Sequence, residues 1–208
     1  MKKLFAIAYW IVQTKAYEWL VKKVIANLNV RIYGYPKLPA SSYFDINEKM
    51  SQGKHKLYVW ASSDTKSIAS FAIRVLTRSK YSHAGIAVVN PGTGIAEAIH
   101  MKASGMAYEP LVDLLAQVDT FTMCELDLEK EEQPMVWERL VGLLAKKDEI
   151  RYDFEQKLGG QALYCSELIW YLLQDTKHKT GLSTHLGREA FPPNLVVKLG
   201  RIIWSKLP

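Results

Sequence analysis

The chain has 208 residues, of which 49% are apolar and 23% charged, and this composition is ordinary for a globular protein with one substantial core. Its two cysteines, Cys124 and Cys165, are too few for a disulfide framework, and the sequence has neither the CxxC nor the HExxH pattern of common zinc sites. The net charge of +6 is concentrated in residues 1–60, where ten Lys or Arg stand against three acidic residues. Nucleic-acid enzymes more naturally spread basic residues over the whole body, so we expect no nucleic-acid partner.

Residues 1–30 are predicted to form an N-terminal amphipathic helix. No Pro or Gly interrupts residues 4–28, and the charged side chains recur at helical spacing. The apolar start, residues 4–12, is too short to span a bilayer, which takes about 20 residues. The helix would pack on the protein's own body or on a partner, lie on an anionic membrane surface through residues 1–28, or act as a cleaved or uncleaved signal. We therefore expect a cytoplasmic or peripheral membrane location, with secretion left open.

Residues 31–55 are rich in Tyr, Pro and Ser and are predicted to be a connector, followed by the main domain at 56–208. In that domain the apolar spacing predicts a strand at 56–61, a helix at 67–77, and two strands around a turn at 90–94. The predicted elements that follow are a short helix at 111–118, a strand at 121–128, a helix at 134–147, a helix after Gly160, and a strand or short helix at 195–207. Residues 101–108 and 175–188 are expected to be loops that shape substrate specificity.

Cys165 is the candidate nucleophile. Gly159 and Gly160 break the preceding segment, and the run after Cys165 has helical apolar spacing, so this cysteine is expected at a helix N-terminus. Unpaired backbone N–H groups and the helix dipole favour a thiolate there, and a thiolate is the reactive form of cysteine. The alternative is a buried cysteine that serves only as a small apolar residue.

His83 and Glu97 are candidates for the partners of this cysteine. His83 begins one strand of the predicted hairpin, and Glu97 is a carboxylate within the next strand, where an unpaired charge is costly. If the turn is centred on residues 91–93, Ile86 faces Glu97 to Ala98, and either Glu97 or His100 is close enough to orient the His83 imidazole. Glu97 could instead form a purely stabilising ion pair with an arginine.

Three segments then resemble a known family. They are the strand and helix at 57–77, Ser82-His83-Ala84-Gly85-Ile86 with Glu97-Ala98, and Tyr152-Asp153 followed by Tyr164-Cys165-Ser166-Glu167-Leu168. In this order they resemble the circularly permuted branch of the NlpC-type papain-like cysteine hydrolases, the YiiX-like proteins, which are related to lecithin retinol acyltransferase-like enzymes. The resemblance covers residues 56–195, but the Gly-Asp that often opens the family's first strand is replaced here by Gly53-Lys54.

The resemblance implies an α+β, permuted papain-like fold with a small antiparallel sheet against helices. It also implies Cys165 as nucleophile, His83 as base and Glu97 as the third polar residue. Tyr164, Tyr152 and Ser166 are weaker candidates for substrate binding or for an oxyanion hole.

The functional hypothesis is a cysteine hydrolase that works through an acyl-enzyme, without metal or organic cofactor. Its substrate would be an amide in a peptide, such as a cell-wall peptide, or an acyl ester or amide in a lipid, and acyl transfer is an open variant. The alternative is a catalytically silent, membrane-associated binding or scaffold domain that keeps the fold.

Overall fold

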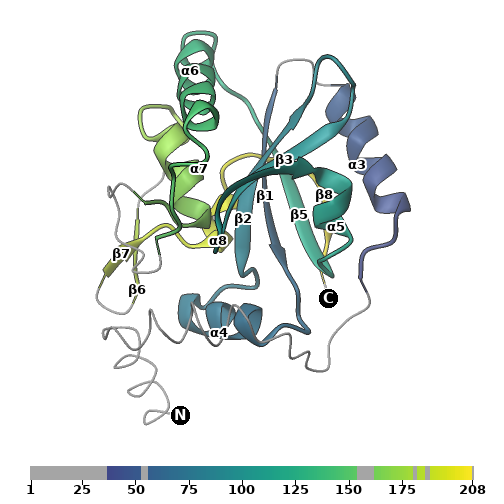
Figure 1. Cartoon of the computed structure of the whole chain (residues 1–208), viewed down its shortest axis with the longest axis vertical. Helices are drawn as coiled ribbons and strands as arrows, with labels where there is room; N and C mark the ends of the chain where they lie inside the picture. Colours follow the sequence, from purple (N-terminus) through teal and green to yellow (C-terminus); the bar gives the residue numbers. More distant parts are fainter. Residues whose placement is uncertain (1–36, 53–55, 154–161, 180–181, 186–187, 208) are drawn as a thin grey trace.

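A six-stranded antiparallel sheet organises the protein in the computed structural model, which describes residues 37–52, 56–153, 162–179, 182–185 and 188–207 (Figure 1). The strand order is β4-β3-β2-β1-β5-β8. The bounds are β1 Leu57–Ser63, β2 His83–Val89, β3 Ala96–Lys102, β4 Gly105–Pro110, β5 Thr120–Leu126 and β8 Arg201–Lys206. Strands β6 (Ser183–His185) and β7 (Arg188–Ala190) form a separate two-stranded ribbon. The α+β class expected from the sequence is confirmed.

Helices cover both faces of the sheet. On one face lie α6 (Glu132–Ala145), α7 (Cys165–Leu173) and α8 (Pro193–Val196), and on the other α3 (Ser41–Ser51) and α5 (Leu111–Leu115) (Figure 1). Helix α4 (Ile68–Thr77) crosses one end of the sheet, at the bottom of the view. Among the described residues, no helix combines the length and the apolar character that crossing a bilayer requires.

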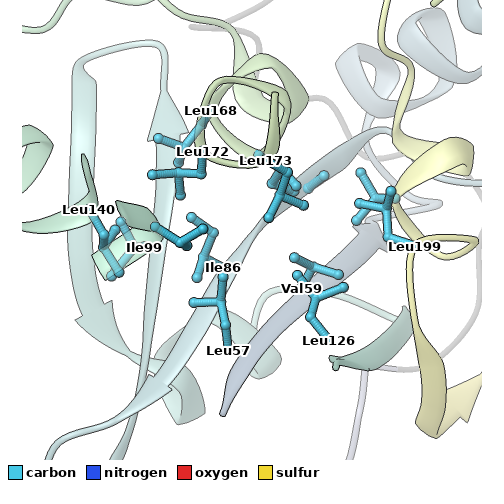
Figure 2. Packing of buried hydrophobic residues seen from close by; sticks show 14 of the residues in the cluster. Leu57, Val59, Ile86, Ile99, Leu126, Leu140, Leu168, Leu172, Leu173 and Leu199 are labelled. Atoms are coloured by element: carbon cyan, nitrogen blue, oxygen red, sulfur yellow. The ribbon is translucent and has the colours of Figure 1, made fainter. Parts of the chain in front are cut away.

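The α7 face of the sheet holds the larger core. Figure 2 shows Leu168 and Leu172 of α7 above Ile86 and Ile99 of the sheet, as the alternation of side chains along a strand requires. All four side chains are essentially inaccessible to solvent. Burying a Leu or Ile side chain stabilises a fold by roughly 1.5–3 kcal/mol, so this contact fixes where α7 begins relative to β2.

The opposite face holds a second core, which includes part of the predicted connector. Ile46 and Met50 of α3 are fully buried there, with Trp60 of β1 and Phe121 of β5. Residues 41–51 are therefore a packed helix and not a linker, which corrects the expected boundary at residue 55 for this stretch. The amphipathic helix predicted for 1–30 lies outside the described residues.

The hairpin of β2 and β3 has a different register from the expected one. Ile86 lies opposite Ile99, and Gly85 opposite His100. Ile86 was expected to face Glu97 to Ala98, so the actual register is shifted by one to two residues along β3. The region predicted as a loop at 101–108 also differs, because most of it continues β3 and then returns as β4. Gly105 follows the tight turn, and its φ of 119° suits glycine.

Gly85 is the one position in β2 where a side chain cannot fit. An added Cβ would lie 2.7 Å from the carbonyl oxygen of Ile99 and 2.8 Å from Cβ of His100, and closer still to the Trp60 ring. We expect Gly85→Ala to lower the free energy of unfolding by about 1–3 kcal/mol, because the backbone and the indole must both shift.

Gly142 of α6 provides the matched control, since nothing lies within 4 Å of an added Cβ there. Gly142→Ala is expected to raise the free energy of unfolding by up to about 1 kcal/mol, from helix propensity alone. Urea denaturation of both variants measures the two changes. Equal effects of the two substitutions would contradict the close packing of Trp60 and His100 over Gly85.

Candidate active site

Cys165 is the first residue of α7, as predicted. Tyr164 precedes it in an extended conformation, and the Glu167 carboxylate reaches back to accept the backbone N–H of Tyr164 at 3.3 Å. Glu167 is buried, so its role in the structure is to cap its own helix. This local structure places the first free N–H groups of α7 around the cysteine sulfur.

The Cys165 thiol is almost completely buried, at 5% exposure of the residue. Burial raises its pKa, although the backbone N–H of Ala84, the backbone N–H and hydroxyl of Ser166, and its own N–H act in the opposite direction. The expectation of a lowered pKa at the helix N-terminus is therefore not met, because desolvation outweighs the N–H groups. Cys165 is a thiol at neutral pH and needs a base to become a nucleophile.

His83 begins β2, as predicted, and is a direct chain neighbour of Ala84. The Cys165 sulfur and the start of β2 thus lie side by side. His83 Nε2 lies 2.6 Å from Nδ1 of His100, and among the described residues the ring makes no other hydrogen bond, so its Nδ1 is open. No hydrogen bond joins this ring to the Cys165 thiol among the described residues, and such bonds between a base and its nucleophile often tighten only when substrate binds.

His100, and not Glu97, is the residue that contacts His83. Glu97 lies opposite Val88, five residues along β2 from His83, or about 16 Å at the rise of a strand. Its Oε1 accepts a hydrogen bond from Asn90 Nδ2 at 3.2 Å, and its buried Oε2 has no hydrogen-bond partner among the described residues. The structure corrects the expected place of Glu97 and supports the rival, His100. The cause is the register shift of the hairpin.

Glu109 and Lys102 extend this arrangement and were missed by the sequence analysis. His100 Nε2 lies 2.9 Å from Glu109 Oε1, and Lys102 Nζ lies 2.5 Å from Glu109 Oε2. Lys102 lies in the segment 101–108 that was predicted to be a loop, and Glu109 directly follows it. The Ser104-Gly105 pair, a turn signal between two alternating segments, was the available hint.

Both imidazoles are held neutral. Burial lowers the pKa of His83 to about 3, with further contributions from His100 and Lys102. Burial and Lys102 likewise lower the pKa of His100 to about 3. The Trp60 ring covers both histidines, with ring centroids 5.4 Å apart in each case. A neutral imidazole has one unprotonated ring nitrogen, which a general base requires.

A small pocket borders the sulfur. Its volume of about 30 Å³ leaves room for one or two water molecules, so a substrate must open it further. No charged side chain is among its described lining residues, which are Ile73, Thr77, Ser82, Tyr152, Tyr164, Cys165, Ser166, Ala190, Phe191, Pro192 and Pro193.

The three weaker candidates all border this pocket. Tyr164 Oη accepts the backbone N–H of Phe191 at 2.9 Å, and the Ser166 hydroxyl donates to the Phe191 carbonyl oxygen. Tyr152 is joined to Leu163 by a single β-bridge. Tyr164 and Ser166 therefore hold the segment around Phe191 against α7.

Each nitrogen of His100 faces a hydrogen-bond partner, and no three His, Cys, Asp or Glu side chains of the described residues are grouped to hold a metal ion.

Comparisons with known proteins show the family and the fold. A family model described as a permuted papain-like amidase enzyme, of the YaeF/YiiX or C92 family, matches residues 60–200. A solved structure of the metalloprotein YiiX from Escherichia coli O157:H7 is similar, with a TM-score of 0.52 and 19% identity. The match covers 74% of this chain and 97% of the YiiX chain, and it shows a shared fold. No curated protein matches the sequence.

Proposed function

Since the chain belongs to the permuted papain-like amidase family of YaeF and YiiX, and is thus a cysteine amidase-like hydrolase, we propose that it forms an acyl-enzyme on Cys165 with His83 as general base. The observation that carries this assignment is the hydrogen bond between His83 Nε2 and His100 Nδ1. This bond engages Nε2 of His83 and leaves its Nδ1 without a hydrogen bond among the described residues. The next residue of β2, Ala84, donates its backbone N–H to the Cys165 sulfur.

In the proposed reaction, His83 Nδ1 takes the proton of the Cys165 thiol as the sulfur attacks the carbonyl carbon. The backbone N–H of Cys165, with a hydroxyl of Tyr152 or Tyr164, stabilises the oxyanion. The imidazolium then gives its proton to the leaving nitrogen or oxygen. Water, deprotonated by His83, hydrolyses the thioester and restores the thiol.

The pocket supports a substrate with an uncharged, apolar acyl group. Its described lining is aromatic, aliphatic or hydroxylic, and a charged residue of a cell-wall peptide would find no counter-ion among these side chains. We therefore favour an acyl ester or amide of a lipid over a charged peptide.

The outer surface of α4 supports the same choice. Phe71 and Val75, one turn apart, are 50% and 42% exposed, while Ile73 and Thr77 of the same helix line the pocket. Residues 66–80 contain four basic side chains and no acidic one. An apolar and basic helix beside the pocket suits an anionic lipid surface. The earlier prediction that residues 1–28 bind such a surface remains a prediction, since they lie outside the described residues.

The test is the pH dependence of hydrolysis in the wild type and in His83→Gln. The substrates are matched p-nitroanilides with an octanoyl group or an acidic peptide, and p-nitrophenyl octanoate. Near pH 7 we expect His83→Gln to lower kcat/KM on the octanoyl substrates by about 10²–10⁴-fold.

The deficit should shrink as the pH rises, because the thiolate then forms without a base. Equal rates and equal pH profiles for the two proteins would refute the role of His83. Absence of turnover on every substrate would favour the binding-domain alternative, and preference for the acidic peptide would refute the choice of an apolar acyl group.

A further inference from the structure

A continuous chain of hydrogen bonds runs across three neighbouring strands on the sheet face that holds Trp60. His83 of β2 contacts His100 of β3 at 2.6 Å, and His100 contacts Glu109 of β4 at 2.9 Å. In the register of β3 and β4, Ala107 lies opposite His100 and Glu109 opposite Ala98, so Glu109 is the diagonal neighbour of His100 on the same face. The chain starts at His83, which follows the pocket residue Ser82 in sequence, and ends at the edge strand β4.

The direction of each hydrogen bond follows from Glu109. Lys102 Nζ donates to one carboxylate oxygen, and an ionised carboxylate can only accept. His100 Nε2 must therefore carry the proton in its bond to the other oxygen. A neutral imidazole has one N–H, so His100 Nδ1 is unprotonated and accepts a hydrogen bond from Nε2–H of His83. The only unprotonated nitrogen of His83 is then Nδ1.

Without the carboxylate, the two bonds could reverse together. His100 could place its proton on Nδ1 and donate it to His83 Nε2, and His83 would then hold its own proton on Nδ1. In that arrangement Nδ1 of His83 carries a proton and cannot accept one from Cys165. Trp60 packs on both rings and favours neither tautomer, since its own N–H donates to the Ile86 carbonyl oxygen at 2.9 Å.

We propose that Glu109, held by Lys102, is a positioning residue that fixes both histidines as their Nε2–H tautomers and so keeps Nδ1 of His83 open as the base for Cys165. This inference rests on the proposed function, because it assigns Glu109 a role in preparing the same base. The Glu109 carboxylate acts on His83 through His100 and does not touch the reacting atoms. Hydrogen-bond partners of catalytic and metal-binding histidines commonly act in this way.

The test compares Glu109→Gln with Glu97→Gln, the same substitution of a carboxylate on the neighbouring strand that lies outside the chain of hydrogen bonds. Ring ¹⁵N chemical shifts at pH 7 report which nitrogen carries the proton. We expect Nε2–H tautomers of His83 and His100 in the wild type and in Glu97→Gln, and a mixture in Glu109→Gln, because an amide can accept or donate.

Alkylation of Cys165 by iodoacetamide at pH 7, in a Cys124→Ser background, gives the second readout. We expect its rate to fall about tenfold or more in Glu109→Gln and to stay unchanged in Glu97→Gln. Unchanged tautomers in Glu109→Gln, or a mixture caused by Glu97→Gln instead, would overturn the proposal.

The two proposals fail in different ways. If Glu109→Gln mixes the tautomers while the wild type hydrolyses no substrate, the positioning role is supported and the proposed function is refuted. If the wild type is active and Glu109→Gln leaves the tautomers unchanged, the proposed function holds and the positioning role is refuted.

Discussion

Replacement of Cys165 with alanine is expected to lower hydrolysis of every productive substrate by at least about a thousandfold, because no acyl-enzyme can form without the sulfur. The first N–H groups of α7 and the pocket remain in this variant, so weak substrate binding should persist. Intact-protein mass spectrometry of quenched reactions provides a direct measurement. The wild type should gain the mass of the acyl group and Cys165→Ala should not.

Cys124 offers a matched control, because it is the other cysteine of the chain and is also buried. Its sulfur lies 3.5 Å from the Val197 carbonyl oxygen within the core, and burial raises its pKa to about 11. Cys124→Ala should lower the free energy of unfolding and leave the acyl adduct in place. An adduct that survives Cys165→Ala and disappears in Cys124→Ala would assign the nucleophile to Cys124 and refute the mechanism.

The positions of Cys165 and His83 could be predicted because each depends on local sequence. The glycine pair and the helical spacing after Cys165 define the start of α7. His83 begins a run of apolar residues that can only be a buried strand. With the order of these motifs, that was enough to suggest the family, and the family model confirms it.

The third partner of the site could not be predicted because it depends on hairpin register. A shift of one residue turns every side chain to the other face, and the turn at 90–94 does not determine the register from sequence alone. The actual register places Glu97 opposite Val88, further from His83, and His100 opposite Gly85, from where its ring contacts the His83 ring. The role of Glu109 was harder to predict, because β4 is a short edge strand in which buried and exposed side chains alternate only weakly.

The pKa of Cys165 also depends on contacts far along the chain. The sequence shows a helix N-terminus, which alone favours the thiolate. It does not show that α4 and the segment around Phe191 close over the sulfur and exclude water. Desolvation then dominates, so Cys165 is a thiol and His83 a neutral imidazole, in place of the thiolate that the helix N-terminus alone would favour.

Acidification is expected to destabilise the protein through the same two histidines. Their pKa values, near 6.5 in an unfolded chain, fall to about 3 in the folded state, so the unfolded chain binds more protons between these limits. The stability they contribute is fully present above pH 6.5 and is lost as the pH falls toward 3. For His100, which is 1% exposed, the loss between pH 7 and pH 4.5 is roughly 2–3 kcal/mol.

Urea denaturation at pH 7 and pH 4.5 measures this loss. The double variant His83→Gln/His100→Gln provides the control, because it keeps the carboxylates that titrate in this range and lacks the two histidines. The difference between pH 7 and pH 4.5 should therefore be larger in the wild type by at least the amount due to His100. Ring Cε1–H shifts of both histidines should stay constant from pH 7 to about pH 4.5. Titration of either ring near pH 6.5 would contradict the buried neutral pair, and it would also deny His83 the neutral form that the mechanism requires across this range.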